Sequence, residues 1–221
     1  MYDLVLKNGT LVNEGKIYES DIAIKGDRIE LIASSINAES KQHLDLHGKH
    51  VLPGLIDDQV HFREPGLTHK ATIETESKAA VAGGITSFIE MPNTVPQSTT
   101  IAKLEEKFLI AKNTSWANYS FMFGGTNDNL NEILKVDPKN VAGLKLFLGS
   151  STGNMLVDNP DVLEEIFKKT DLLISVHCED EKTIKDNLEI YLDKYGDDIP
   201  IEMHPKIRNE EACYISSSKA I

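Results

Sequence analysis

From residue 53 to the C-terminus, short apolar segments alternate with longer segments whose apolar residues recur at helical spacing. The short segments have the length and the β-branched and aromatic content of strands. Four of them are expected to be strands: residues 85–91, 119–123, 143–148 and 172–176. Because parallel strands need a long crossover between them, usually a helix, this alternation predicts a parallel sheet that is either open or closed as a barrel.

The helical segments are recognised by their spacing and by their first residues. One expected helical face follows residue 100 and carries Ile101, Leu104, Phe108 and Leu109. Asn159 and Pro160 predict the start of another helix, because Asn is a good cap and Pro suits the first helical position. That helix is expected to turn four side chains inward: Val162, Leu163, Ile166 and Phe167. Further helices are expected at residues 180–195 and 208–220.

The first fifty residues have a different pattern, in which short alternating segments are separated by turn residues. The expected strands are residues 2–7, 10–12, 21–24, 28–32, 44–46 and 50–52. Asn8-Gly9 is interpreted as a tight turn between the first two strands, and Gly26-Asp27 as a turn before the fourth. Residues 1–52 are therefore expected to form a β-rich N-terminal module, and residues 53–221 a separate β/α part.

The length of the β/α part limits what it can form. A complete (β/α)8 barrel usually needs about 250 residues. Counting from Leu52 gives about five strands, and the sequence stops within the last helical pattern. The expected fold class is α/β: a (β/α)8 TIM-type barrel that is incomplete in this chain, preceded by a small β-sandwich module. We therefore expect the chain to be C-terminally truncated.

Charge and composition exclude several classes of protein. There are 35 acidic and 23 basic residues, and the basic ones do not cluster, so nucleic acid is not an expected partner. No apolar run approaches the roughly 20 residues of a membrane span. The N-terminus lacks the pattern of a signal peptide, and two cysteines, Cys178 and Cys213, imply no disulfide framework. We expect a cytoplasmic protein that acts on a small molecule.

Polar side chains interrupt the apolar pattern near the C-terminal ends of three expected strands. Successive side chains of a strand point to opposite faces, so His61 shares its face with Gln59 and Arg63. Lys145 and His177 likewise oppose the apolar residues beside them. The apolar set is expected to face the outer helices, which leaves the polar set pointing into the barrel at the rim that carries active sites. Two His and one Lys at one rim are typical of a metal site.

Each of these residues also has a structural explanation. A single His at a strand end is often only hydrogen-bonded, and a Lys opposite an apolar face often extends to solvent. Lys145 is unusual as a metal ligand, because an ammonium group repels a cation. Burial lowers the pKa of a lysine, and a neutral amine can add carbon dioxide to become a carbamate with two oxygens for two metal ions. A two-metal site can activate water and polarise an amide carbonyl, which suits hydrolysis of a cyclic amide.

Five segments follow one another in a specific order. Residues 57–66 read DDQVHFREPG, and residues 90–94 read EMPNT. Residues 143–147 read GLKLF, residues 176–180 read VHCED, and residues 204–212 contain His-Pro, an Arg and Glu-Glu-Ala. Together they resemble the dihydroorotases of the amidohydrolase superfamily: the D-x-H-x-H-F-R-E-P-G signature, the M-P-N segment, the carboxylated-lysine strand, the next ligand strand and a segment without a ligand. The resemblance covers the whole chain.

The resemblance implies a metal-dependent hydrolase of cyclic amide C–N bonds, which interconverts dihydroorotate and carbamoyl-aspartate in de novo pyrimidine biosynthesis. His61 would bind the first zinc ion, Lys145 as a carbamate would bridge two, and His177 would bind the second. Arg63 and Asn93 would hold the substrate carboxylate, and a guanidinium suits a carboxylate because it offers two parallel hydrogen bonds. A surface ion pair for Arg63 and a turn role for Asn93 remain alternatives. A homo-oligomer is also expected.

Two departures from the family pattern bear on activity. Gln59 stands where the pattern has the first His of the H-x-H pair, and an amide oxygen is a weaker zinc ligand than imidazole. The family's last metal-binding His and its catalytic Asp would lie beyond residue 221, so no catalytic residue is expected within this chain. These 221 residues alone are expected to be inactive, and hydrolysis of dihydroorotate by them would contradict this. Rival hypotheses are a non-catalytic dihydroorotase-like scaffold, favoured by Gln59, and another cyclic amidohydrolase, such as an allantoinase or hydantoinase.

Other polar residues are assigned structural roles. Cys178 falls on the opposite strand face from His177, so a core thiol is favoured over a nucleophile. His69 is interpreted as a loop residue. Three further histidines, in the N-terminal module, are interpreted as solvated surface residues: His43, His47 and His50. Residues 150–153, which follow the lysine strand, are expected to form a turn.

Overall fold

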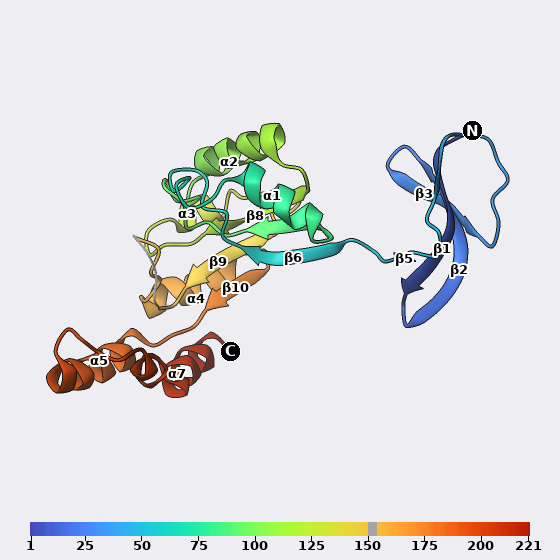
Figure 1. The fold of residues 1–221 in the computed structure, drawn as a ribbon. Coiled ribbons are helices and arrows are strands. Elements are labelled where there is room, and N and C mark those ends of the chain that lie inside the picture. The colour runs from blue at the N-terminus through green and yellow to red at the C-terminus, as the bar shows by residue number, and fades with distance from the viewer. Residues whose placement is uncertain (150–153) are drawn as a thin grey trace. The chain divides into compact units, whose positions relative to one another are not determined.

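The computed structural model describes residues 1–149 and 154–221, and the turn expected at residues 150–153 lies outside the described residues. The chain divides into two compact units, Met1–Leu55 and Ile56–Ile221 (Figure 1). The fold is α/β, as expected: a β-sheet module is followed by a parallel sheet that forms part of a (β/α) barrel. Within the described ranges, no helix has both the length and the apolar character needed to span a membrane.

The first unit is built on one five-stranded sheet. Its strands are β1 (Tyr2–Asn13), β2 (Lys16–Lys25), β3 (Arg28–Ala33), β4 (Ser40–Asp45) and β5 (His50–Val51). Their order is β3-β2-β1-β4, and β5 also pairs with β1. Strands β2 and β3 are antiparallel to their neighbours, with the expected turn at Gly26-Asp27 between them, whereas β4 and β5 run parallel to β1. Val5, Ala23 and Ile36 form the buried core of this unit.

The turn expected at Asn8-Gly9 is wrong, because β1 continues through both residues. Asn8 has a φ angle of 56°, and the register with β2 shifts at this point, so the two residues form a β-bulge. The carboxylate of Asp21 stabilises the bulge by accepting the N–H of Asn8 at 2.9 Å. The hairpin turn lies instead at Glu14 and Gly15, which both have positive φ, as a type I′ turn requires.

The second unit contains a parallel sheet that corresponds to part of a barrel. Its strands are β6 (Leu55–Val60), β7 (Ile85–Glu90), β8 (Asn118–Gly124), β9 (Gly143–Phe147) and β10 (Ile174–His177), in the order β10-β9-β8-β7-β6. The pairs β7–β8, β8–β9 and β9–β10 are parallel. Neighbours in sequence are neighbours in the sheet, as in a (β/α) barrel. The C-terminal strand ends therefore gather at one rim.

The helices of the second unit follow the strands along the chain. They are α1 (Ile73–Ala82), α2 (Ile101–Thr114), α3 (Leu130–Ile133), α4 (Pro160–Lys169), α5 (Glu181–Tyr195), α6 (His204–Ile207) and α7 (Glu210–Ala220), with a 3-10 turn at Ile201–Met203. Helix α4 begins as expected, because the Asn159 side chain accepts the N–H of Asp161 at 3.0 Å. The inward direction expected for Phe167 is wrong, because this side chain is 42% exposed, and Leu109, placed by its spacing on the apolar face of α2, is 59% exposed. Spacing identifies a helical face, but its width depends on what packs against it.

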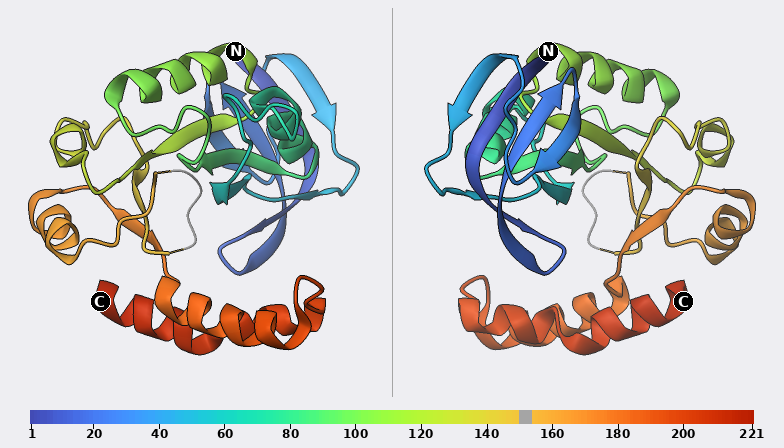
Figure 2. Two further views of the ribbon diagram at one scale, coloured as in Figure 1. Left: turned by 90° about the vertical axis from the view of Figure 1, so that its left-hand side faces the viewer. Right: turned by 90° about the vertical axis from the view of Figure 1, so that its right-hand side faces the viewer.

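The main hydrophobic core lies between the parallel sheet and the helices on its outer side (Figures 1 and 2). Phe62 and Phe88 pack with tilted rings whose centroids lie 4.6 Å apart, and Phe108 of α2 contacts Phe121 of β8 edge to face at 4.7 Å. Leu144 and Leu146 of β9 join the same cluster. This layer holds the strands in register and so determines where their C-terminal ends lie.

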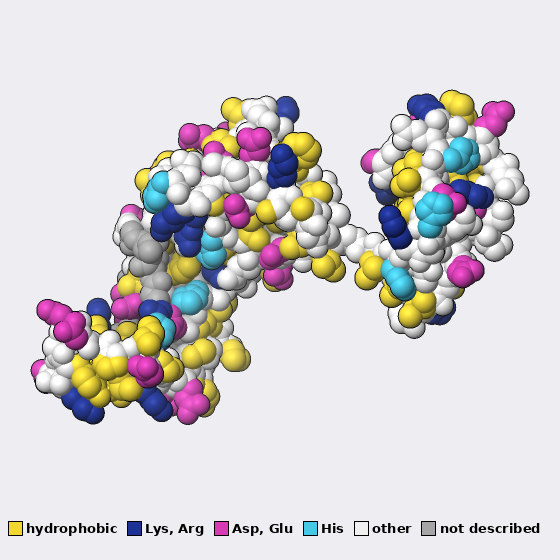
Figure 3. Space-filling view, in the orientation of Figure 1, with side chains coloured by type: hydrophobic (Ala, Val, Ile, Leu, Met, Phe, Trp, Pro, Cys, Tyr) yellow, Lys and Arg dark blue, Asp and Glu magenta, His cyan; other side chains and the backbone are white. Residues whose placement is uncertain are grey.

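The inner side of the sheet is much less covered. Leu173, which precedes β10, is 71% exposed, and Leu55, which lies on the same face of β6 as Gln59, is 60% exposed. Hydrophobic side chains are also visible on the surface of this unit (yellow in Figure 3). Strands β6 and β10 each have one neighbour in the sheet among the described residues. The described residues therefore complete the outer layer of packing but not the interior of a closed barrel.

Candidate metal and substrate site

The residues expected at the site all lie at the C-terminal rim of the parallel sheet. His61 and Arg63 follow β6, and Asn93 follows β7. Lys145 lies within β9, and His177 is the last residue of β10. In the space-filling view, His side chains lie close to Lys and Arg side chains in the middle of this unit (Figure 3). Four strands thus deliver the expected residues to one rim.

Strand register places Lys145 and His177 on the same side of the sheet. Lys145 pairs with Ser175, and Phe147 pairs with His177, so all four side chains share one face. The leucines that alternate with Lys145 pack in the outer core instead. The alternation expected from the sequence is confirmed for these two strands. Their polar side chains face the barrel interior.

His61 is held by the segment that follows the next strand. Its Nδ1 lies 2.8 Å from Oδ1 of Asn93, so Nδ1 carries the proton and the lone pair of Nε2 is left for a metal ion. Loss of hydration lowers the pKa of His61 most, and the positive charges of Arg63 and Lys145 lower it further, against the effect of the Asn93 hydrogen bond. These charges are therefore close enough to act on one another. The imidazole is biased towards its neutral, metal-binding form.

Lys145 is the most enclosed of the expected ligands. The residue is 3% exposed, and its Nζ lies 3.4 Å from the Ser175 hydroxyl and 5.5 Å from the ring centroid of Phe147. Among the residues that the structure describes, no carboxylate forms an ion pair with it. Burial lowers the pKa of Lys145 because the charged ammonium loses hydration. A lysine in this environment is suited to become a neutral amine and then a carbamate.

His177 is oriented by the carboxylate of Glu179, a residue to which the sequence motifs assign no role. Its Nε2 lies 2.8 Å from Oε2 of Glu179. Arg208, which precedes α7, donates hydrogen bonds to both carboxylate oxygens of Glu179, with its Nε 2.9 Å from Oε1. A carboxylate that fixes a histidine ring is a common support for a metal ligand. The position of Glu179, two residues after His177, was the available sequence signal.

The donor set fits a metal ion in type but is incomplete. Two imidazoles and a lysine able to form a carbamate suit Zn2+. No group of three or more His, Cys, Asp or Glu side chains gathers into a ready ligand set within residues 1–149 and 154–221. Gln59, the weak ligand position, is exposed on β6, where its N–H donates to Asp57 Oδ1 at 3.2 Å.

The loops that carry Arg63 and Asn93 are packed directly on each other. Gly66 has a φ angle of 83°, and a Cβ atom there would lie 1.8 Å from the carbonyl oxygen of Val95. The N–H of Val95 donates to the carbonyl of Pro65 at 3.1 Å. The first loop can approach the second this closely because residue 66 has no side chain.

Gly66→Ala is expected to lower the free energy of unfolding of this unit by more than about 2 kcal/mol, because it adds a backbone clash to an unfavourable φ. Gly84→Ala is the matched control, since Gly84 has a φ of 91° with open space around it. The control should lose only about 1 kcal/mol. Urea unfolding measures both variants, and equal losses would show that the close approach at Val95 is not needed.

Other candidates take the structural roles expected of them. Cys178 is partly buried, and burial raises the pKa of its thiol, which opposes a nucleophilic role. Both cysteines are free. Four histidines are exposed, as expected for surface residues: His43, His47, His50 and His69.

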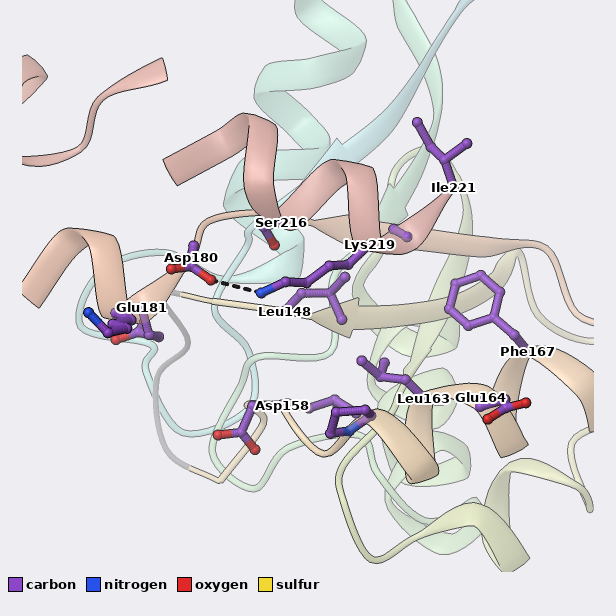
Figure 4. A pocket seen from close by; sticks show the side chains of 14 residues that line it. Leu148, Asp158, Leu163, Glu164, Phe167, Asp180, Glu181, Ser216, Lys219 and Ile221 are labelled. Carbon is purple, nitrogen blue, oxygen red and sulfur yellow. Dashed lines mark hydrogen bonds and ion pairs between the residues drawn. The ribbon is translucent and has the colours of Figure 1, made fainter. Parts of the chain in front are cut away.

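A cavity of about 700 Å³ lies between α4 and α7 (Figure 4). Leu163 and Phe167 contribute apolar walls, and Lys219 Nζ is paired with Asp180 at 3.0 Å along its side. None of the residues expected to hold metal or substrate lines this cavity. It is therefore separate from the site at the strand ends.

The fold and the site together define a class: a β-sheet module joined to part of a (β/α) barrel, with His, Lys and His side chains at the ends of its strands. Residues 48–190 match the model of the family described as Dihydro-orotase-like. The chain belongs to this family. The expected resemblance is confirmed at the level of this family, whereas the narrower assignment to the dihydroorotases stays a prediction.

The chain is similar to proteins named allantoinases and to a hydantoinase of known structure. It is 35% identical over 196 residues to the allantoinase of Desulfitobacterium hafniense, covering 86% of this chain and 44% of that protein. It is 36% identical over 188 residues to the allantoinase of Salmonella newport, covering 80% and 41%. The L-hydantoinase (dihydropyrimidinase) structure from Arthrobacter aurescens has a TM-score of 0.92 at 29% identity, with 100% of this chain and 50% of that chain covered. The chain thus spans about half the length of the relatives it matches.

Proposed function

We propose that the full-length protein is a metal-dependent cyclic amidohydrolase that interconverts dihydroorotate and carbamoyl-aspartate, a step of de novo pyrimidine biosynthesis. The observation that supports this substrate is the placement of Arg63. Its backbone N–H is bound by the buried Glu90, and its charge lies close enough to His61 to lower the pKa of that imidazole. A guanidinium beside a metal site suits a ring that carries a carboxylate.

The chain's own residues divide the work of such a reaction. His61, His177 and Lys145 as a carbamate would hold the zinc ions, which when bound supply a Lewis acid and a water of lowered pKa. Because Asn93 Oδ1 is engaged by His61, its NH2 group is the part left to donate to a substrate carboxylate. Arg63 and Asn93 would then orient the ring. Water adds to the ring amide carbonyl, the C–N bond breaks, and the nitrogen keeps the electron pair and takes up a proton.

The test compares four rings on the full-length protein: dihydroorotate, dihydrouracil, hydantoin and allantoin. Dihydroorotate should be preferred in kcat/KM by at least about 100-fold, because only the carboxylate-bearing ring provides an ionic partner for the partly buried Arg63. A ring without a carboxylate as the best substrate would refute this assignment. The four rates are measured by the loss of ring absorbance or by chromatography of the products.

Allantoin hydrolysis is the second candidate function. The observation that favours it is the 35% identity to the allantoinase of Desulfitobacterium hafniense, which exceeds the identity to the hydantoinase structures. Allantoin lacks a ring carboxylate, so this function assigns Arg63 no ionic partner in the substrate. A preference for allantoin in the four-ring comparison would establish it over the first proposal.

A non-catalytic scaffold remains the rival from outside the enzymes, and Gln59 is the residue that favours it. Metal analysis of the full-length protein separates the two: about one to two zinc ions per folded chain supports the enzyme, and near-zero zinc supports the scaffold. The cytoplasmic location and the homo-oligomer expected from the sequence stay predictions.

Gln59→His is expected to tighten zinc binding at the first position by at least about 10-fold, because imidazole replaces a weaker amide oxygen next to His61. Competition with a chelator measures the affinity. Gln42→His, on the exposed strand β4 of the first unit, is the control and should change nothing. Unchanged affinity in Gln59→His would show that residue 59 does not reach the metal.

A further inference from the structure

Two fully buried charges lie beside the candidate site. Glu90 is the last residue of β7, Lys107 lies in the middle of α2, and both are 0% exposed. Glu90 Oε2 and Lys107 Nζ form an ion pair. The lysine Nζ also lies 5.2 Å from the ring centroid of Phe121. The pair is thus enclosed in the apolar layer between the sheet and the helix.

The remaining polar atoms of this pair bind the backbone of the two loops at the site. Glu90 Oε1 accepts the N–H of Arg63 at 3.2 Å. Lys107 Nζ donates to the carbonyl of Met91 at 2.9 Å. Asn93 follows Met91 by two residues, so one end of the pair holds the loop of Arg63 and the other holds the segment of Asn93.

The backbone of Arg63 needs such support. Its φ angle is 69°, in the left-handed region that a residue with a side chain rarely adopts. A conformation of this kind persists only where its surroundings hold it, and such residues cluster at binding sites. The bond from Glu90 is made to the N–H of this same residue.

Stability alone does not explain a buried ion pair. Burial raises the pKa of Glu90 and lowers the pKa of Lys107, because each group loses the hydration of its charge. Replacing such a pair by apolar side chains of similar size is often neutral or stabilising. Apolar side chains could fill the space, but they could not bind the Arg63 N–H or the Met91 carbonyl.

We propose that Glu90 and Lys107 are positioning residues, whose buried ion pair sets the placement of Arg63 and Asn93 for binding of the ring carboxylate. The link to the carboxylate rests on the proposed function. The placement of the loops is a property of the fold and can be tested separately.

The test uses two double variants of the full-length protein. Glu90→Met with Lys107→Met keeps the volume and removes both polar contacts. Glu90→Gln with Lys107→Met also removes the ion pair, but of the two contacts to the loop backbone it removes only the one to Met91 and keeps a carbonyl oxygen for the Arg63 N–H. Leu104→Ala is the control, because Leu104 is a core residue of the same helix, 5% exposed and on the same outer layer.

Amide hydrogen exchange reports the loops directly. In the first double variant, residues 61–66 and 91–98 should exchange at least about 10-fold faster, with the urea midpoint unchanged. In the Glu90→Gln, Lys107→Met variant, only residues 91–98 should exchange faster, and residues 61–66 should exchange as in the wild type. Leu104→Ala should lower the urea midpoint without this selective loosening. Two results would overturn the proposal. One is an exchange rate in the first double variant that equals that of the wild type in both segments, and the other is the same increase in both segments in both double variants.

Kinetics then tests the substrate. The first double variant should raise KM for dihydroorotate at least about 10-fold and change kcat by less than about 3-fold, because misplaced Arg63 weakens ground-state binding. If the first double variant does not fold, the Glu90→Gln, Lys107→Met variant still tests the positioning role, because it must speed amide exchange in residues 91–98 and leave residues 61–66 protected. Loosened loops without any turnover of dihydroorotate by the wild type would sustain the positioning role and refute the proposed function.

Discussion

Lys145→Met in the full-length protein is expected to reduce kcat/KM for ring hydrolysis by at least about 1000-fold and to remove most of the bound zinc. Methionine matches the length and volume of lysine but cannot form a carbamate. Because Lys145 is 3% exposed and faces Phe147, an apolar side chain should fit without loss of stability. Metal content per chain and steady-state kinetics are measured on the same preparation.

Lys139→Met is the control for this experiment, because Lys139 is exposed and lies before the strand of Lys145. It should leave both metal content and rate unchanged. Retained zinc together with retained activity in Lys145→Met would exclude a carbamate at this position. Retained zinc with lost activity would place Lys145 in a role other than metal binding.

Arg63→Met is expected to lower kcat/KM for dihydroorotate by about 100- to 1000-fold, since it leaves a desolvated carboxylate without its partner. The rate with dihydrouracil, the same ring without the carboxylate, should change little. The comparison of the two rings within one variant separates a lost contact from a damaged fold. Steady-state kinetics on both substrates provides the measurement.

Arg28→Met is the control, because Arg28 is exposed in the first unit, with an 82% exposed side chain. Arg63→Lys adds a second comparison: a single ammonium cannot make two parallel hydrogen bonds, so it should restore only part of the lost affinity. Equal losses for dihydroorotate and dihydrouracil in Arg63→Met would mean that Arg63 supports the loop and does not recognise the carboxylate.

Some of the site could be predicted from the sequence. The alternation around Lys145 and His177 placed both side chains on one face, and the register of β9 with β10 confirms it. The position of Arg63 two residues after His61 likewise followed from the motif. The first inference succeeds because side-chain direction in a strand depends on residue number alone. Arg63 lies beyond the end of β6 and has a φ of 69°, so the expected alternation from Gln59 through His61 does not extend to it.

Other features could not be predicted, and each depends on a partner far away in the chain. The residue types of Asn8-Gly9 are compatible with a β-bulge as well as with a turn. Which of the two forms depends on Asp21 in the next strand, whose carboxylate accepts the Asn8 N–H. The exposure of Phe167 depends on what covers the outer face of α4. Lys107 reads in sequence as an ordinary polar residue of a helix, although the fold buries it completely.

The sequence by itself determined the class of fold, the order of β/α units and the strand ends at which His61, Lys145 and His177 lie. These depend on local periods of two and 3.6 residues and on short motifs. Only the tertiary structure decided that Glu90 forms an ion pair with Lys107, and that Arg208 binds the Glu179 carboxylate that contacts His177. Such pairs form between segments brought together by packing, where a buried charge is tolerated only beside its partner.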